Sequence, residues 1–142
     1  VVDDFNNIYK VKRGINISYK NDGKNKYLIY GIENRIEQII ANLLDNAISF
    51  SDDNKNVIVQ VSKSEDNKVY IKILDEGRGF KEKDTNKIFK RFYSNRPDKF
   101  GQHSGLGLNI VKNLVDLHNA TIKATNREDK KGASMEIEFP KV

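Results

Sequence analysis

The stretch Gly101-Gln-His-Ser-Gly-Leu-Gly-Leu-Asn-Ile-Val-Lys112 places three glycines within seven residues and continues into an apolar run with helical spacing. Glycine lets the backbone approach a ligand closely, and a helix start offers unpaired N–H donors and a partial positive charge. The stretch therefore fits a phosphate-binding turn before a helix over residues 106–118. It also fits an ordinary glycine turn.

Length and composition indicate a single folded domain. The chain of 142 residues is long enough for one hydrophobic core, and a hydrophobic content of 37% argues against disorder. Cysteine is absent, which excludes disulfides and thiolate metal sites, and two isolated histidines argue against zinc. The sequence shows no apolar run long enough to cross a membrane and no signal-peptide pattern.

The formal net charge of +5 is compatible with several kinds of partner. The lysines alternate with acidic residues, as in Lys81-Glu82-Lys83-Asp84, which predicts a mixed solvated surface rather than a basic stripe. We therefore expect no nucleic-acid partner.

The apolar pattern predicts an α+β fold. Alternation with period two predicts strands over residues 15–19, 27–30, 57–61, 69–74, 121–125 and 134–139. Turn formers at 21–25 join the first two strands into a hairpin. Helical spacing predicts helices over residues 33–47, 86–92 and 106–118.

This order predicts a two-layer α/β sandwich, in which a mixed, mostly antiparallel sheet carries its helices on one face. A row of polar residues predicts that the other face is solvated: Gln60, Lys72, Lys123, Glu136 and Glu138. Residues 1–14 are polar and patternless, and we expect a linker or the end of a preceding element there. The domain itself is expected over residues 15–142.

Asn42 and Asn46 lie four residues apart beside the apolar stripe of the first long helix, so they share one face. Asparagine is a moderate-to-poor helix former, which makes the pair informative. Amide oxygens suit Mg²⁺, a cation that takes few protein ligands together with substrate phosphates. Two solvated surface amides are the alternative.

The segment Ile73-Leu-Asp-Glu-Gly-Arg-Gly79 ends a predicted strand in a carboxylate, Asp75, followed by two glycines. At the mouth of an apolar pocket, this carboxylate can accept a hydrogen bond from the exocyclic amine of a base, and the glycines let the ring approach the backbone. An ordinary Asp/Gly turn is the alternative.

The segment Lys87-Ile-Phe-Lys-Arg-Phe-Tyr93 spaces two phenylalanines for a helical contact with the core. Arg91 in this segment either turns toward phosphates or lies on the surface. The loop over residues 93–104 is long for a compact domain, and such loops are often lids or binding loops.

Four segments in order resemble the N box, first glycine box, F box and second glycine box of sensor histidine kinases. They are Asn42-Leu-Leu-Asp-Asn-Ala47, Asp75-Glu-Gly-Arg-Gly79, Ile88-Phe-Lys-Arg-Phe-Tyr93 and Gly101-Gln-His-Ser-Gly-Leu-Gly-Leu108. Each box alone is weak, whereas four in this order are specific, and the resemblance covers residues 15–140. It implies the Bergerat ATP-binding fold, an α/β sandwich with the nucleotide between the helices.

The resemblance also implies roles for individual residues. Asn46 would hold Mg²⁺, and Asn42 would lie by the metal and the phosphates of ATP. Asp75 would recognise adenine in a pocket shaped by Gly77 and Gly79. The other nucleotide-binding residues that it implies are Ser49, Phe50, Arg91, Tyr93, Gly101, Ser104, Gly105, Leu106, Gly107, Leu108 and Ser134.

Within that set, residues 93–104 would form the ATP lid, and residues 104–108 would give their backbone amides to the phosphates. Gly132-Ala-Ser134 resembles the closing glycine box, with Ser134 under the adenine-binding Asp75.

The chain departs from the family pattern at several positions. Ser49 and Phe50 stand where the family often has Lys or Arg and then Tyr, which puts one phosphate contact in doubt; Arg91, Arg96 or Lys99 can compensate. His118-Asn119-Ala120 replaces a common His-Gly-Gly at an expected turn. The stretch over residues 89–108 particularly resembles the alphaproteobacterial ChvG-type sensor kinases.

Neither histidine lies in the helical His-Glu context of the family's phosphoacceptor, since His103 belongs to the lid and His118 ends a helix. The chain therefore resembles an isolated catalytic domain that binds ATP and Mg²⁺ and contains no phosphorylated histidine. The expected partners are the histidine-bearing dimerisation domain of the same kinase and, indirectly, a response regulator. The isolated domain is expected to be a monomer, and the full kinase a homodimeric inner-membrane sensor with this domain in the cytoplasm.

Two other functions are weighed against this resemblance. ATPases akin to DNA gyrase or MutL proteins carry a Glu general base where this chain has Asn42, and without a base to activate water hydrolysis should be slow. A non-enzymatic basic module for nucleic acid would need an aromatic-basic stacking pattern, which the sequence lacks.

Overall fold

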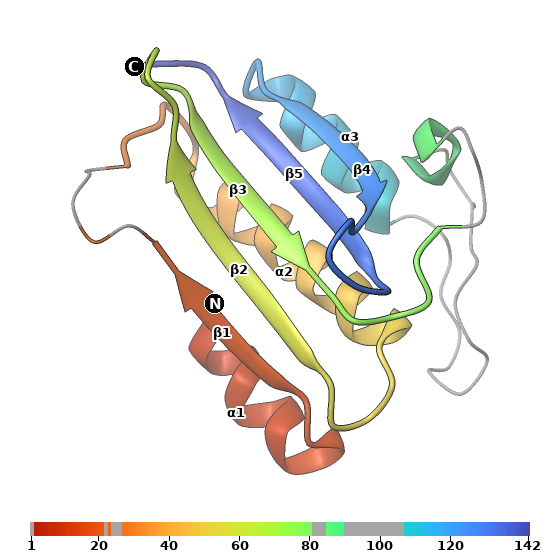
Figure 1. The fold of residues 1–142 in the computed structure, drawn as a ribbon. Helices are drawn as coiled ribbons and strands as arrows, with labels where there is room; N and C mark the ends of the chain where they lie inside the picture. Colours follow the sequence, from red (N-terminus) through yellow and green to blue (C-terminus); the bar gives the residue numbers. More distant parts are fainter. Residues whose placement is uncertain (1, 22, 24–26, 81–84, 90–106) are drawn as a thin grey trace.

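The computed structural model describes residues 2–21, 23, 27–80, 85–89 and 107–142. Its elements are α1 (Val2–Arg13), β1 (Asn16–Lys20), α2 (Glu33–Phe50), β2 (Asn56–Lys63), β3 (Val69–Leu74), the 3-10 helix η1 (Thr85–Phe89), α3 (Gly107–Leu117), β4 (Thr121–Asn126) and β5 (Ala133–Phe139). The described strands form one sheet, with α2 and α3 against one face and α1 beside β1 (Figure 1). The predicted α+β sandwich is confirmed.

The strand order in the sheet is β1-β2-β3-β5-β4. β1 and β2 are parallel, whereas the other neighbouring pairs are antiparallel. Parallel neighbours need a crossover connection, and α2 supplies it between β1 and β2. The sheet is therefore mixed and mostly antiparallel, as predicted.

The predicted hairpin over residues 15–30 is wrong. Residues 27–32 form no strand, and β1 pairs with β2 instead. The alternating pattern over residues 27–30 nevertheless matches the burial of these side chains. Tyr27 and Ile29 pack against the core, whereas Leu28 and Tyr30 are exposed. An extended segment lying over an apolar surface produces that pattern without pairing to another strand.

Residues 2–13, which show no clear sequence pattern, form α1. Acidic residues in its first turn and basic residues in its last turn complement the helix dipole. Phe5 and Tyr9, one turn apart, stack with ring centroids separated by 6.0 Å. Gly14 ends the helix with φ at 67°, a conformation that glycine adopts without strain.

Arg13 joins the end of α1 to the end of α2. Its guanidinium donates to the carbonyl oxygens of Ile48 at 2.8 Å and Ser51 at 2.6 Å, and its Nε pairs with Asp53 at 2.7 Å. The last carbonyls of a helix have no intrahelical partner, and a cation there also opposes the helix dipole. Arg13 thus fixes the C-terminal end of α2.

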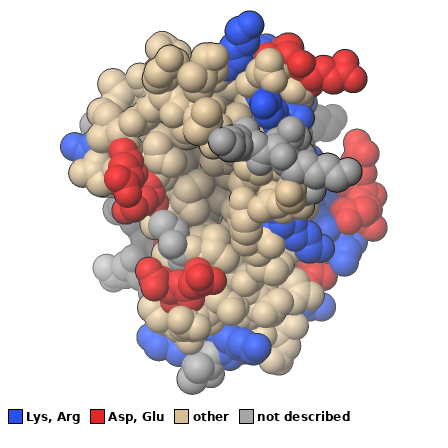
Figure 2. All heavy atoms as spheres, turned by 90° about the vertical axis from the view of Figure 1, so that its left-hand side faces the viewer, with Lys and Arg blue, Asp and Glu red and all other residues tan. Residues whose placement is uncertain are grey.

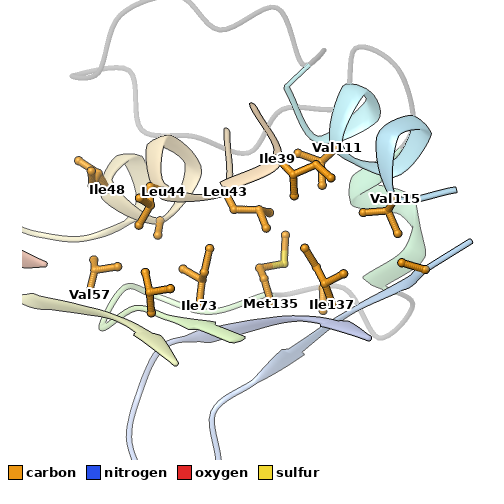
Figure 3. Packing of buried hydrophobic residues seen from close by; sticks show 14 of the residues in the cluster. Ile39, Leu43, Leu44, Ile48, Val57, Ile73, Val111, Val115, Met135 and Ile137 are labelled. Atoms are coloured by element: carbon orange, nitrogen blue, oxygen red, sulfur yellow. The ribbon is translucent and has the colours of Figure 1, made fainter. Parts of the chain in front are cut away.

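The core lies between the helices and the sheet (Figure 3). The buried positions of α2 confirm its predicted apolar stripe, and facing side chains come from α3, β2, β3 and β5. The labelled residues of this layer are Ile39, Leu43, Leu44, Ile48, Val57, Ile73, Val111, Val115, Met135 and Ile137. Each such side chain stabilises the fold by about 1.5–3 kcal/mol relative to exposure.

The opposite face of the sheet is polar, as predicted. Strand register places Gln60, Lys72, Glu136 and Lys123 side by side across four strands. The Lys72 Nζ lies 3.5 Å from a Glu136 carboxylate oxygen. Cross-strand charge pairs of this kind suit a solvated face.

On the face drawn in Figure 2, Lys and Arg lie in separate groups among Asp and Glu, not in a continuous band. Lysines also pair with acids, such as Lys112 with Asp116 at 2.9 Å. Among the described helices, none has the length and apolar character needed to span a bilayer.

Candidate functional site

Predicted site residues from three elements meet at the end of β3. The turn that follows β3 touches the end of α2, since a Cβ added to Gly77 would lie 2.4 Å from the carbonyl oxygen of Phe50. On the other side lies β5, where Ser134 is the register partner of Leu74. α3 packs against α2, which brings Gly107 and Leu108, the described part of the predicted second glycine box, to the same helical layer (Figure 1).

Asp75 is the buried carboxylate of this site, with 3% of its surface exposed. Its Oδ1 accepts hydrogen bonds from the backbone N–H groups of Gly77 at 2.9 Å and Ala133 at 3.0 Å. Among the residues that the structure describes, no donor is bonded to Oδ2. Buried polar atoms normally have partners, so Oδ2 is a position where a ligand N–H can bind.

Burial raises the pKa of the Asp75 carboxyl, because the charged form is less favourable away from water. The two backbone donors and the positive charge of Arg127 lower this pKa, whereas the neighbouring Glu76 raises it. Arg127 also donates from Nη1 to the backbone carbonyl of Asp75 at 3.1 Å. Sequence reasoning missed Arg127 because only the pairing of the strands brings residue 127 to residue 75.

Two glycines allow the backbone to close around Asp75. Gly77 has no room for a side chain, because a Cβ there would meet the backbone carbonyl of Phe50 at the end of α2. Gly132 has φ at 148°, and a Cβ there would lie 2.1 Å from the Asp75 carbonyl oxygen. The turn that carries Asp75 is therefore held between α2 and the β4–β5 connection.

The asparagine pair lies on α2, one turn apart. Asn46 is buried, with 3% of its surface exposed, whereas Asn42 is half-buried. Asn46 is thus not a solvated surface amide, and its side-chain oxygen is of the type that hard cations take. In the described part of the chain, no group of three or more His, Cys, Asp or Glu side chains could hold a metal ion.

Ser49 and Phe50, the departures from the family pattern, lie at the end of α2. The Ser49 hydroxyl donates to the Asp45 carbonyl of the same helix at 2.8 Å. The guanidinium carbon of Arg78 lies 5.3 Å from the centroid of the Phe50 ring, a cation–π contact that the sequence did not predict. Phe50 therefore forms an apolar wall beside the Asp75 turn, while the Ser49 hydroxyl is engaged within its own helix.

The other predicted residues come from the F box, the expected lid and the second glycine box. Gly107 begins α3, and Leu108 packs against the core. The predicted residues that lie outside the described part of the chain are Arg91, Tyr93, Arg96, Lys99, Gly101, His103, Ser104, Gly105 and Leu106.

His118 follows the end of α3 and has a structural role. Its Nε2 accepts a hydrogen bond from the Ile32 N–H at 3.1 Å, and its Nδ1 lies 2.7 Å from the Leu114 carbonyl. Because Nε2 accepts, Nδ1 carries the proton and donates. The ring thereby ties the segment before α2 to the end of α3.

Comparisons with known proteins agree with this geometry. Residues 31–142 match the family described as histidine kinase-, DNA gyrase B- and HSP90-like ATPases. Sensor protein ChvG of Agrobacterium fabrum is 35% identical in an alignment of 139 residues that covers 93% of this chain and 23% of ChvG. The chain thus spans less than a quarter of that relative.

Solved structures give the same result. The catalytic domain of histidine kinase ThkA superposes with a TM-score of 0.82 and 26% identity, over 99% of this chain and 88% of that one. ThkA in complex with the response regulator TrrA matches with a TM-score of 0.76 and 23% identity, over 99% of this chain and 38% of that one. The resemblance to sensor histidine kinases, and to ChvG in particular, is confirmed. The chain belongs to the family of histidine kinase-, DNA gyrase B- and HSP90-like ATPases.

Proposed function

We propose that this chain is the catalytic domain of a sensor histidine kinase, which binds MgATP and delivers its γ-phosphate to a histidine on a separate dimerisation domain. The observation that carries the proposal is the buried Asp75 carboxylate, whose Oδ1 is fixed by two backbone donors while Oδ2 has no bonded donor among the described residues. The amino group of adenine is a donor that suits Oδ2, and membership of an ATPase family implies ATP as the ligand.

The residues around Asp75 fit an adenine ring. Phe50 offers an apolar surface, and Gly77 lets the Asp75 turn lie against the end of α2, because a side chain at residue 77 would meet the Phe50 carbonyl. Gly79 and Ser134 complete the proposed pocket. Guanine presents a carbonyl oxygen where adenine has its amino group, so the Asp75 carboxylate would repel it.

The phosphate end of the site is proposed on α2 and α3. Asn46 would bind Mg²⁺, with Asn42 beside the metal and the phosphates. The start of α3 at Gly107, together with the glycine-rich stretch before it, would direct backbone N–H groups at the phosphates. Bound MgATP supplies the phosphoryl group, and the chain contributes positioning and charge stabilisation.

A gyrase-like or MutL-like ATPase is not favoured. Asn42 is an amide and cannot take a proton from water as a general base does. We expect hydrolysis by the chain alone to be slow, because phosphoryl transfer would await the accepting histidine.

The partners follow from the same proposal. ThkA has been solved with a response regulator, so we infer that a response regulator receives the phosphoryl group downstream. The full protein would be a homodimeric inner-membrane sensor with this domain in the cytoplasm, and the isolated domain a monomer. Residues 15–142 would form the catalytic domain, after a linker or preceding element over residues 1–14.

Phosphoryl transfer in trans tests the proposed activity. The chain mixed with the histidine-bearing domain of the same kinase and γ-labelled ATP should label that domain with acid-labile phosphate. A histidine-bearing domain whose acceptor histidine is changed to glutamine should stay unlabelled. Labelling of this chain alone, or of neither protein, would contradict the assignment.

Asn46→Ala should weaken MgATP binding about tenfold while changing metal-free ATP binding little, because the variant loses a proposed ligand of the cation. Calorimetric titrations with and without Mg²⁺ measure both affinities. The control is Asn34→Ala, an exposed position in the first turn of the same helix. Equal MgATP affinity in Asn46→Ala and wild type would show that Asn46 is not a ligand of the cation.

A further inference from the structure

Asn126, the last residue of β4, bonds both backbone groups of Phe80. Its Oδ1 accepts from the Phe80 N–H at 2.6 Å, and its Nδ2 donates to the Phe80 carbonyl at 3.1 Å. One side chain thus supplies the two bonds that a neighbouring strand would give. A Cβ added to Gly79 would lie 2.6 Å from the same Oδ1, so the turn lies directly against Asn126.

Arg127, the next residue, bonds the other end of the same turn. Its Nη1 donates to the Asp75 carbonyl at 3.1 Å, while Nε and Nη2 donate to the Asp129 carboxylate at 3.0 and 2.8 Å. Only 6% of the Arg127 side chain is exposed. A buried guanidinium is unfavourable unless its donors are paired, so this bidentate pairing defines its orientation.

The backbone of the β4–β5 connection reinforces this contact. The Arg127 N–H donates to the Gly132 carbonyl at 2.9 Å, and the Ala133 N–H donates to Asp75 Oδ1 at 3.0 Å. The connection therefore contacts both the carbonyl and the carboxylate of Asp75.

We propose that Asn126 and Arg127 form a clamp that positions the turn from Asp75 to Phe80 and thereby holds the Asp75 carboxylate in place for its ligand. Both are positioning residues that act through the turn. The proposal rests on the proposed function only for the identity of the ligand, since the clamp bonds exist without one.

The clamp also has an electrostatic consequence. Burial raises the pKa of Asp75, and Arg127 lowers it; among the residues that the structure describes, the other charged side chain that acts on this pKa is Glu76, which raises it. From α2, the group that meets this turn is the Phe50 carbonyl, which carries no net charge. An ionised Asp75 accepts a ligand N–H, so affinity falls as pH falls through the Asp75 pKa. Without the Arg127 charge, this loss should begin at a higher pH.

Amide hydrogen exchange on the nucleotide-free chain tests the clamp directly. Asn126→Ala should speed exchange of the Phe80 amide, and Arg127→Gln that of the Gly77 amide, each by about tenfold or more. Lys68→Gln is the control, because it removes one positive charge near the start of β3, away from the Asp75 turn. Unchanged exchange at both amides would overturn the clamp.

Titration with MgATP between about pH 5 and pH 8 distinguishes the effect of the Arg127 charge from the effect of its hydrogen-bond geometry. Arg127→Gln should bind about tenfold more weakly at neutral pH, and its loss of affinity in acid should move to higher pH. Arg127→Lys keeps the positive charge but lacks the planar guanidinium group. Its affinity for MgATP should fall at the same acidic pH as that of wild type, but it should bind MgATP more weakly than wild type does. If Arg127→Gln does not fold, Arg127→Lys is the variant that tests the clamp.

The outcomes distinguish the two proposals. Arg127→Gln with wild-type affinity and pH profile would overturn the clamp while leaving the nucleotide site in place. Faster exchange in the variants, combined with no MgATP binding by wild type, would support the clamp and overturn the proposed function. A uniform loss of affinity at every pH would contradict the electrostatic part of the clamp.

Discussion

Asp75→Asn should weaken MgATP binding about 100-fold and remove, or even reverse, the preference for MgATP over MgGTP. The backbone N–H groups of Gly77 and Ala133 both point at Oδ1, so the oxygen of an asparagine amide must take that position. The amide NH₂ then occupies the position of Oδ2 and faces the ligand. A donor there opposes the amino group of adenine and suits the carbonyl of guanine.

Parallel titrations of wild type and variant with MgATP and MgGTP measure this change. Asp66→Asn is the control, because it removes the same charge from an exposed turn between β2 and β3. Wild-type selectivity in Asp75→Asn would show that this carboxylate does not contact the base.

Gly132→Ala should lower the free energy of unfolding by about 3 kcal/mol or more. Its φ of 148° is one that residues with a side chain rarely adopt, and the added Cβ would lie 2.1 Å from the Asp75 carbonyl oxygen. That oxygen belongs to a backbone held by Arg127, so it cannot move away without opening the site. Urea unfolding followed by circular dichroism gives the change in stability.

Gly14→Ala provides a matched comparison. Gly14 also has a positive φ, and its added Cβ would lie 2.1 Å from Asn54 Oδ1, a side-chain atom that can rotate away. We expect a loss of only about 1–2 kcal/mol there, from the left-handed backbone alone. An equal loss of unfolding free energy in both variants would contradict the claim that the close contact of Gly132 with the Asp75 carbonyl adds to the cost of the substitution.

The fold and part of the site could be predicted from local patterns. The apolar stripe of α2 recurs at helical spacing from Ile36 to Ala47, and this sustained pattern identifies a helix with a buried face. Asp75 follows an apolar strand and precedes two glycines, which together mark a carboxylate at the end of a strand. Both features depend on neighbouring residues in the chain.

Two of the features that were missed depend on contacts between residues that are distant in sequence. The alternating pattern of residues 27–30 arises because one side of an extended segment is buried. It does not show which strand β1 pairs with, and that partner is β2, which follows the α2 crossover. The contact of Arg127 with Asp75 exists because β3 and β5 pair and β5 pairs with β4. The α1 helix had local evidence in its acidic start, basic end and Gly14, but it lacks a clear apolar period.

Calorimetric titration of the wild-type chain with MgATP, run in parallel with MgGTP, tests most directly whether Asp75 is the base-selecting group of a nucleotide site. We predict saturable binding of MgATP and at least about tenfold weaker binding of MgGTP, because the fixed carboxylate accepts from adenine and repels the guanine carbonyl. Absence of saturable MgATP binding, or equal affinity for the two nucleotides, would contradict this assignment.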